Sequence, residues 1–376
     1  MRQFSFLLCA AFLLATANVS AQTNDTTTQT NDTTTQTITS AQSPDATNPA
    51  PSGFLSHLDV TNFQLLGRFM HDRDSNDVLQ ASKLQWQLDL KANLNFDKEG
   101  NYLVHTRVSS GDVVDGGFSD TGIGYGSHPR SNLYVKRLYF QARPLKGMEF
   151  QVGSIPFFRG EATPVTHYDE GGFIIGERVT LRHPEHLYFD EITYTVGYIG
   201  ATFTPNVLLR MGNFGRINYH QYLVEKHFDD RVSGSFEYSN QYLESVFREA
   251  VHVKVKELKV VDAVRAEFYQ RTLVTPGNGY NVVGEKQVTK RLLLTVGFAA
   301  IDRNYVGFNN EEYNIGRHVY ATGKYQFSRD WAVGFFTTRG VLTDYYLTNG
   351  RRFDVIVYYD ALDAIKRSGL WRRFST

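Results

Sequence analysis

The segment KLQWQLDLKANLNF (Lys83–Phe96) alternates strictly between apolar and polar side chains. Its apolar positions are Leu84, Trp86, Leu88, Leu90, Ala92, Leu94 and Phe96. Successive side chains of a β-strand point to opposite faces, so one face of this strand is apolar and the other is polar. The stretch exceeds the roughly five or six residues of an ordinary strand and suffices for the roughly 9–11 residues of a membrane-crossing strand. It therefore predicts part of a β-barrel wall.

Weaker alternation of the same kind recurs as far as the C-terminal region, at residues 148–152, 192–198, 251–255, 292–300, 319–327 and 353–359. Taken together, these segments predict an all-β protein. Because their polar faces carry charges that a packed core could not accept, we expect a transmembrane, antiparallel up-and-down β-barrel with a polar interior. A secreted β-sandwich or β-helix is the soluble alternative.

The connections between these strands fall into short and long groups, as in outer-membrane barrels. Short turns are expected at 97–100, 144–147, 204–206, 257–258 and 328–330, and long polar connections at 71–82, 110–131, 155–186, 303–316 and 342–350. Placing the short turns at one end requires an added strand at Tyr280–Gln287. Residues 216–245 fit either one long loop or a further strand pair. The barrel is therefore expected to have 16 strands, with 14 as the alternative.

The N-terminal region divides into two segments ahead of the barrel. Arg2, an apolar stretch and Val19-Ser20-Ala21 form the pattern of a secretory signal peptide at 1–21. Residues 22–56 repeat a Thr/Asn/Gln-rich heptapeptide and predict a disordered spacer, which leaves 57–376 for the barrel. The single cysteine, Cys9, lies in the signal segment, so disulfides are not expected in the mature chain.

Composition excludes one class of function. The chain of 376 residues has 39 Lys+Arg and 39 Asp+Glu, and therefore no formal net charge. A nucleic-acid binder normally carries a basic excess, so no nucleic-acid partner is expected. Aromatic residues make up 14% of the chain, and those near strand ends suit the interfacial girdles of a membrane barrel.

The signal segment, the alternating strands, the asymmetric connections and the long connection Ile155–His186 resemble those of Gram-negative outer-membrane porins. The segment Pro156-Phe157-Phe158-Arg159-Gly160-Glu161 is similar to the start of the porin loop that folds into the barrel and narrows it. The resemblance implies an outer-membrane channel in contact with lipid, without a cofactor, for passive diffusion of small hydrophilic solutes. It also leaves a homotrimer open. The chain departs from porins at its end, where Phe374 is third from the last residue instead of terminal.

Charged residues in these segments are the candidate site residues, since charged rings set the selectivity of such pores. Candidates in the constriction loop are Arg159, Glu161, Asp169, Glu170, Glu177, Arg178 and Arg182. Candidates on the lumen wall are Lys83, Asp89, Lys91, Arg107, Glu149, Arg210, Lys254, Lys256, Arg265 and Lys324. Their modest basic excess favours anionic or neutral solutes, and a mixed lumen with little preference is the alternative.

Two other functions remain as alternatives. The long loops of a surface barrel could capture a ligand or a host partner. An outer-membrane hydrolase would need a histidine near a carboxylate, which His167 and Asp169 or the cluster His183, Glu185 and His186 could supply. Neither set comes with a serine in a nucleophile turn or with zinc-ligand spacing. We therefore expect scattered loop histidines, without catalytic or metal-binding residues.

Overall fold

A computed structural model describes residues 57–368 of the chain, apart from 115, 168–173, 184–186, 202, 242–243, 256–258, 274–275, 303–315 and 342–349. The predicted signal peptide and spacer, and the tail with Phe374, lie outside these residues. None of the helices within the described part is long and apolar enough to span a membrane.

The described residues form a single β-sheet with short helices at its ends. Its strands are β1 (Leu58–Arg73), β2 (Leu79–Asn95), β3 (Tyr102–Ser109), β4 (Ser119–Tyr125), β5 (Tyr134–Leu145), β6 (Met148–Ile155), β7 (Ile174–Arg182), β8 (Glu191–Ile199), β9 (Tyr219–His227), β10 (Val232–Gln241), β11 (Glu244–Lys254), β12 (Ala263–Leu273), β13 (Gly277–Thr289), β14 (Leu292–Ile301), β15 (Gly316–Gln326), β16 (Trp331–Gly340) and β17 (Arg351–Asp360). The helices are α2 (Val207–Arg210), the 3₁₀ turn η2 (Met211–Asn213) and α3 (Ala361–Ser368).

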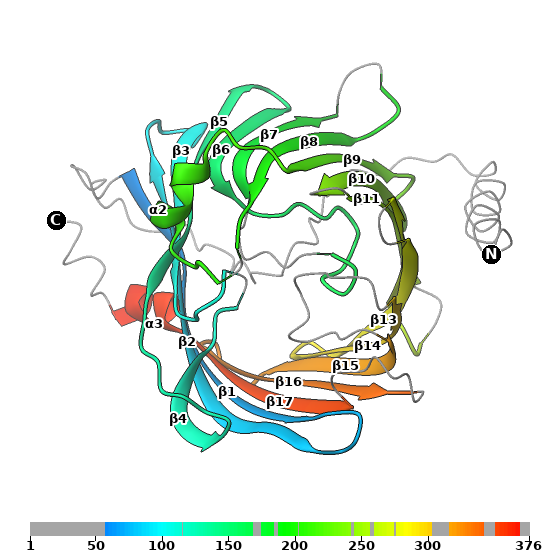
Figure 1. The fold of residues 1–376 in the computed structure, drawn as a ribbon. Coiled ribbons are helices and arrows are strands. Elements are labelled where there is room, and N and C mark those ends of the chain that lie inside the picture. The colour runs from blue at the N-terminus through cyan, green and yellow to red at the C-terminus, as the bar shows by residue number, and fades with distance from the viewer. Residues whose placement is uncertain are drawn as a thin grey trace, which may run out of the picture. The chain divides into compact units, whose positions relative to one another are not determined.

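The sheet closes on itself, because β1 pairs in antiparallel fashion with both β2 and β17. Figure 1 looks along the resulting barrel. β3 and β4 occupy one position in the wall: β3 pairs with residues 89–95 of β2, and β4 pairs with residues between Ser82 and Trp86 of the same strand. The barrel therefore has sixteen strand positions, as predicted. Residues 216–245 supply the strand pair β9 and β10, and β13 is the added strand predicted at Tyr280–Gln287.

The two ends of the barrel differ. At one end, named here the turn end, lie the start of β1, the end of β17 and connections as short as 146–147 and 290–291. The opposite end, named the loop end, carries the longer connections 156–173, 200–218, 302–315 and 341–350. Short connections, such as 74–78, also occur at the loop end. The predicted difference in connection length between the two ends therefore holds only as a tendency.

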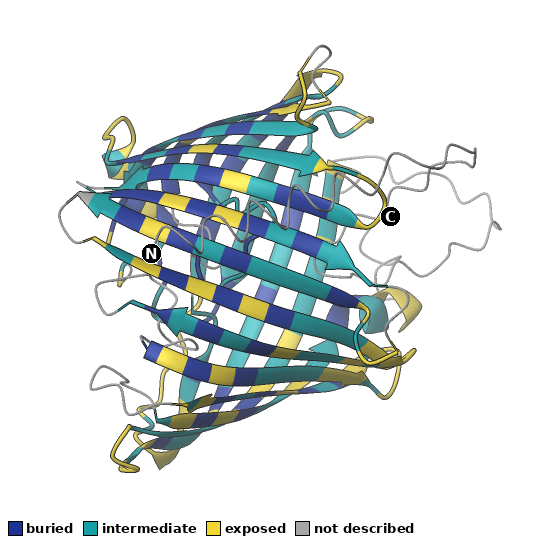
Figure 2. Cartoon of the chain, turned by 90° about the vertical axis from the view of Figure 1, so that its right-hand side faces the viewer, coloured by how far each residue is buried: buried dark blue, intermediate teal, exposed yellow. Residues whose placement is uncertain are grey.

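Side chains along the strands are distributed inside out relative to a water-soluble protein. On β17, Phe353 and Val357 are 43% and 39% exposed, whereas Arg352 and Asp354, on either side of Phe353, are 4% and 1% exposed. Figure 2 shows a similar alternation on the strands that face the viewer, where buried residues are interspersed with intermediate and exposed ones. An apolar outer surface of this kind requires an apolar solvent, and closure leaves no unpaired strand edge.

Several predicted connections were wrong, each for a local reason. The long connection expected at 71–82 is the tight turn 74–78, in which Asp74 Oδ1 accepts hydrogen bonds from the backbone N–H groups of Asn76 and Val78. Residues 155–186 include β7, and 110–131 include β4. The turn expected at 204–206 is the start of α2, because the Asn206 side chain caps that helix by accepting from Leu208 N–H.

Two adjacent residues of β17 provide a test of which face meets lipid. Val355 faces outward with Phe353 and Val357, and Ile356 faces the lumen with Arg352 and Asp354. We expect Val355→Lys to destabilise the bilayer-inserted barrel by about 2–4 kcal/mol, the cost of a lysine at the bilayer midplane. The matched Ile356→Lys variant should lose much less. Urea-induced unfolding in liposomes measures both, and equal losses would contradict the assignment of faces.

Candidate functional site

Residues 156–167 leave the wall after β6 and run inside the barrel, where they are seen within the ring of strands in Figure 1. Along this path Gln221 of β9 donates a hydrogen bond to Phe158 O at 2.6 Å, and Ser235 Oγ of β10 accepts one from Glu161 N–H at 2.9 Å. Thr163 then contacts β12 and β13. We name residues 156–167 the inner loop, since they line the lumen over much of the β9–β13 wall.

Two buried carboxylates of the wall hold the inner loop. Glu267 accepts hydrogen bonds from Thr163 N–H at 2.7 Å and from Thr166 Oγ1 at 2.5 Å. Glu237 lies 2.9 Å from His167 Nε2 through its Oε2 and pairs with Arg248 through its Oε1. A buried carboxylate is stable only when its oxygens are satisfied, so each of these contacts both fixes the loop and offsets the cost of burying a charge.

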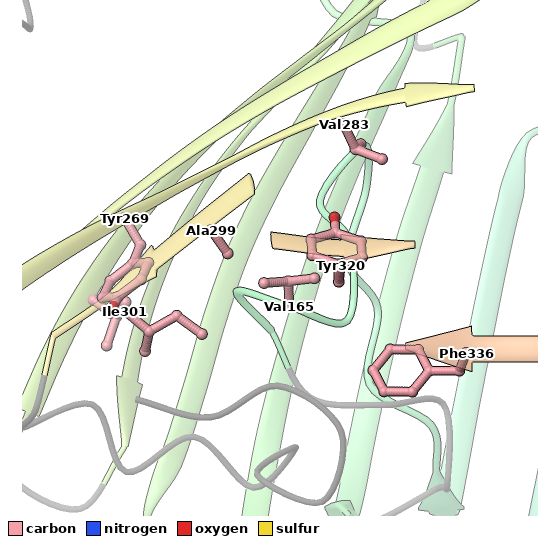
Figure 3. Packing of buried hydrophobic residues seen from close by; sticks show 8 residues of the cluster. Val165, Tyr269, Val283, Ala299, Ile301, Tyr320 and Phe336 are labelled. Carbon is pink, nitrogen blue, oxygen red and sulfur yellow. The ribbon is translucent and has the colours of Figure 1, made fainter. Parts of the chain in front are cut away.

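Apolar side chains of the loop fill spaces on the same wall. Val165 is 3% exposed and lies among Tyr269, Val283, Ala299, Ile301, Tyr320 and Phe336, which come from β12 to β16 (Figure 3). Phe157 packs edge-on against Tyr219 of β9 and against His167. The loop is therefore held by packing at both ends as well as by hydrogen bonds.

Glu161 of the inner loop faces the wall of β10–β12. Glu161 Oε2 lies 3.8 Å from Arg265 Nη2 and 3.9 Å from His252 Nδ1, and Ser233 Oγ donates to Glu161 Oε1. The chain comes this close at Gly160, whose φ is +57° and at which a Cβ atom would lie 2.7 Å from Ser235 Cβ. Only glycine fits this approach at low cost.

A second segment, residues 110–118, also enters the lumen and was not predicted. It interrupts the wall between β3 and β4, where Lys136 Nζ donates to Val113 O at 2.8 Å and to Gly116 O. Arg68 lies 3.9 Å over the ring of Phe118. The fully buried Val114 belongs to the same cluster as Phe157 of the inner loop. The two inward segments thus narrow the barrel from neighbouring parts of the wall.

Most of the lumen candidates lie on inward faces and form ion pairs. Asp89 pairs with Arg107 and lies 3.9 Å from Lys91 Nζ. Lys83 pairs with Asp120 at 3.0 Å. Glu149 accepts hydrogen bonds from Arg143 and Arg182. Lys254 shares the inward face of β11 with His252, and Lys324 Nζ lies 4.7 Å from the ring centroid of Tyr358. The interior is therefore a network of paired charges instead of a simple basic lining.

Some candidates are placed differently from the prediction. Glu177, Arg178 and Arg182 belong to β7 and not to a loop, and Glu177 is exposed on the outer face. Arg210 is the last residue of α2, buried near the barrel end instead of lying on a strand. Asp169, Glu170 and Lys256 lie outside the described residues.

The groups that anchor the inner loop and residues 110–118 were mostly not predicted from the sequence. Glu237, Arg248 and Lys136 sit in strands whose alternation is irregular, so no local pattern separated them from other polar residues. Of the hydrolase candidates, His167 is buried against Glu237, and His183 donates its backbone N–H to Asp190 O. Asp169, Glu185 and His186 lie outside the described residues. Within the described part, no group of three His, Cys, Asp or Glu side chains could hold a metal ion.

Comparison with known proteins connects this geometry to a fold. No protein-family model matches the chain, and no curated protein sequence matches it. Among solved structures, it is similar to two engineered variants of the porin of Rhodopseudomonas blastica, each with a TM-score of 0.51 and 12% identity over 81% of this chain and 99% of the porin. A structure from work on engineered proteins with asymmetric conductivity has a TM-score of 0.52 at 11% identity and the same coverage. The chain therefore has a porin-like fold.

The burial of His167 against Glu237 should make docking of the inner loop dependent on pH. Burial lowers the pKa of His167, against the opposing effect of Glu237, which favours the neutral form of the docked histidine at neutral pH and above. A released histidine would take up a proton below its ordinary pKa of about 6.5. Docking should therefore be strongest above that pH and weaken as the pH falls from about 6.5 toward the lowered pKa.

Hydrogen exchange of the 157–167 peptide checks this expectation. After correction for intrinsic rates, protection should be lower at pH 5 than at pH 7.5 in the refolded chain. In His167→Asn, which cannot titrate, the difference between the two pH values should largely disappear. An unchanged pH dependence in that variant would contradict the role of His167.

Proposed function

We propose that this chain, which has the fold of a bacterial porin, is an outer-membrane channel for the passive diffusion of small hydrophilic solutes. Its exposed apolar wall would contact lipid, and its charged interior would contact water and solute. The inner loop and residues 110–118 would form the constriction that limits solute size. The export signal at 1–21, the spacer at 22–56 and a homotrimer remain predictions from sequence within this proposal.

One observation carries the proposal: a loop that leaves the wall and is fastened inside the barrel by buried carboxylates. Glu267 and Glu237 hold it from β12 and β10, with Val165 packed beyond them. A loop with no task in the lumen would need no such fastening, since each buried charge has to be compensated. A constriction element must hold its position against moving solute and water.

The proposed preference for anions rests on Arg178. Arg178 is 3% exposed, and its guanidinium donates to Thr195 Oγ1, Gln151 Oε1 and Pro156 O, none of which is charged. Among the described residues no carboxylate forms an ion pair with it. Because Pro156 begins the inner loop, this positive charge lies where the loop departs from the wall. Other lumen cations, including Arg107 and Arg182, have carboxylate partners that cancel much of their field.

Single-channel recording in a planar bilayer tests both parts of the proposal. We expect stable open steps on the order of a nanosiemens, as for a water-filled barrel, and a reversal potential in a salt gradient that indicates anion preference. Arg178→Gln should lower the anion-to-cation permeability ratio about fourfold, because one unit charge at about 10 Å in water shifts the energies of an anion and a cation by about 0.4 kcal/mol each in opposite directions.

The matched control is Arg291→Gln, which removes a positive charge from the β13–β14 turn outside the lumen and should leave the ratio unchanged. If a correctly folded barrel gives no steps, the channel proposal is wrong. If steps appear but Arg178→Gln leaves the reversal potential unaltered, only the selectivity assignment fails.

A further inference from the structure

Four arginines form a row on the outside of the barrel at its loop end. Arg317, Arg339, Arg351 and Arg73 lie on the consecutive strands β15, β16, β17 and β1. Arg339 is the cross-strand partner of Arg351, and Arg351 is the partner of Arg73. On β15, Arg317 lies two residues before Val319, the cross-strand partner of Arg339, and its C=O accepts from Val341 N–H at 3.0 Å. We name these residues the arginine row.

The row faces outward, as its neighbours on each strand show. Arg317 lies between buried Gly316 and His318 and shares its face with exposed Val319. The flanking residues Thr338 and Arg352 of β16 and β17 point inward and are buried. On β1, Arg73 shares the outer face with Phe69, which is 38% exposed. None of the four side chains therefore lines the lumen.

Charge within the row is only partly compensated. Asp77 Oδ1 lies 2.7 Å from Arg351 Nη2, and Asp77 Oδ2 lies 3.6 Å from Arg73 Nη1. For Arg317 and Arg339, no ion pair is formed with any residue in the described part of the chain. Like charges that face each other across strands destabilise a sheet. Among the described residues, the row pairs four guanidinium groups with one carboxylate, so it favours an added anion.

The position of the row along the barrel identifies where that anion would come from. Toward the turn end, the same outer faces carry Phe353, Val355, Phe335 and Phe69, all apolar. The arginines thus mark the border at which the apolar band ends on four adjacent strands. In a membrane this border lies at the lipid headgroups, and guanidinium groups bind phosphate with paired hydrogen bonds.

We propose that the arginine row binds phosphate-bearing lipid headgroups of the leaflet that surrounds the loop end. This inference rests on the proposed function, because it requires the barrel to span a membrane. The row would hold a fixed ring of anionic lipid against β15, β16, β17 and β1. Asp77 orients two of the guanidinium groups, and Arg317 and Arg339 supply charge that no carboxylate in the described part of the chain compensates.

The test compares two double variants of the full chain refolded in zwitterionic detergent. Arg317→Gln with Arg339→Gln removes two charges from the row, and Lys290→Gln with Arg291→Gln removes two exposed charges from the turn end. Native mass spectrometry would follow titration with dioleoyl phosphatidic acid, with dioleoyl phosphatidylcholine and with inorganic phosphate alone. We expect the row variant to bind phosphatidic acid about 20- to 30-fold more weakly, at about fivefold per charge, and the turn-end variant to bind as the unmodified chain does.

Equal weakening in both double variants, or no weakening in the row variant, would overturn the proposal. Binding of inorganic phosphate at the same affinity as phosphatidic acid would instead indicate a site for soluble anions. If the glutamine variant fails to fold, Arg317→Lys with Arg339→Lys keeps the charge, and the loss of paired hydrogen bonds should give an intermediate affinity. Conductance of the same samples distinguishes the two proposals. Lipid binding that depends on the arginine row, in a protein that shows no conductance, would refute the proposed channel function and leave the lipid-binding proposal standing.

Discussion

The pairing of β1 with β17 is the constraint on which the rest of the structure depends. It joins the first and last strands over a register from Gln64–Asp360 to Arg73–Arg351 and leaves the sheet without an edge. Only a closed sheet satisfies every backbone hydrogen bond where no water is present. Closure also creates two unlike surfaces, so strict alternation along β2 or β17 becomes an apolar exterior and a polar interior. The inner loop, the paired lumen charges and the arginine row all follow from that division.

Within the barrel, the buried charges organise the lumen instead of merely lining it. Glu267 and Glu237 face inward from wall strands, and each would be costly to bury without the donors that the inner loop supplies. The loop in turn hides Val165 and Phe157 against the wall. Polar and apolar contacts therefore support the same loop position, which is how a segment without regular secondary structure can remain fixed in a barrel.

The sequence allowed the all-β barrel, its sixteen positions and most of the inward-facing residues to be predicted, because period-two alternation is a local signal. The prediction was wrong where this alternation is interrupted. In β7, Glu177 and Arg178 are adjacent and point to opposite sides of the sheet. Two charged residues in succession break the apolar–polar alternation, so the sequence predicts a loop there. Near Asp74, polar residues suggested a long loop although they form a tight turn. Residues 110–118 and the partners of the inner loop depend on contacts between distant strands, which no local pattern contains.

The most direct test of the account is to ask which medium each residue of β2 contacts. Cys9 is the only native cysteine and lies in the predicted signal segment, so single cysteines can be placed freely in a Cys9→Ser background. A fluorophore attached at position 84, 88 or 90 should be quenched by lipids brominated on their acyl chains. Cysteines at positions 83 and 91 should instead react with a charged, water-soluble maleimide and escape that quenching. The account predicts this two-residue alternation, and equal reactivity and quenching in both sets would contradict it.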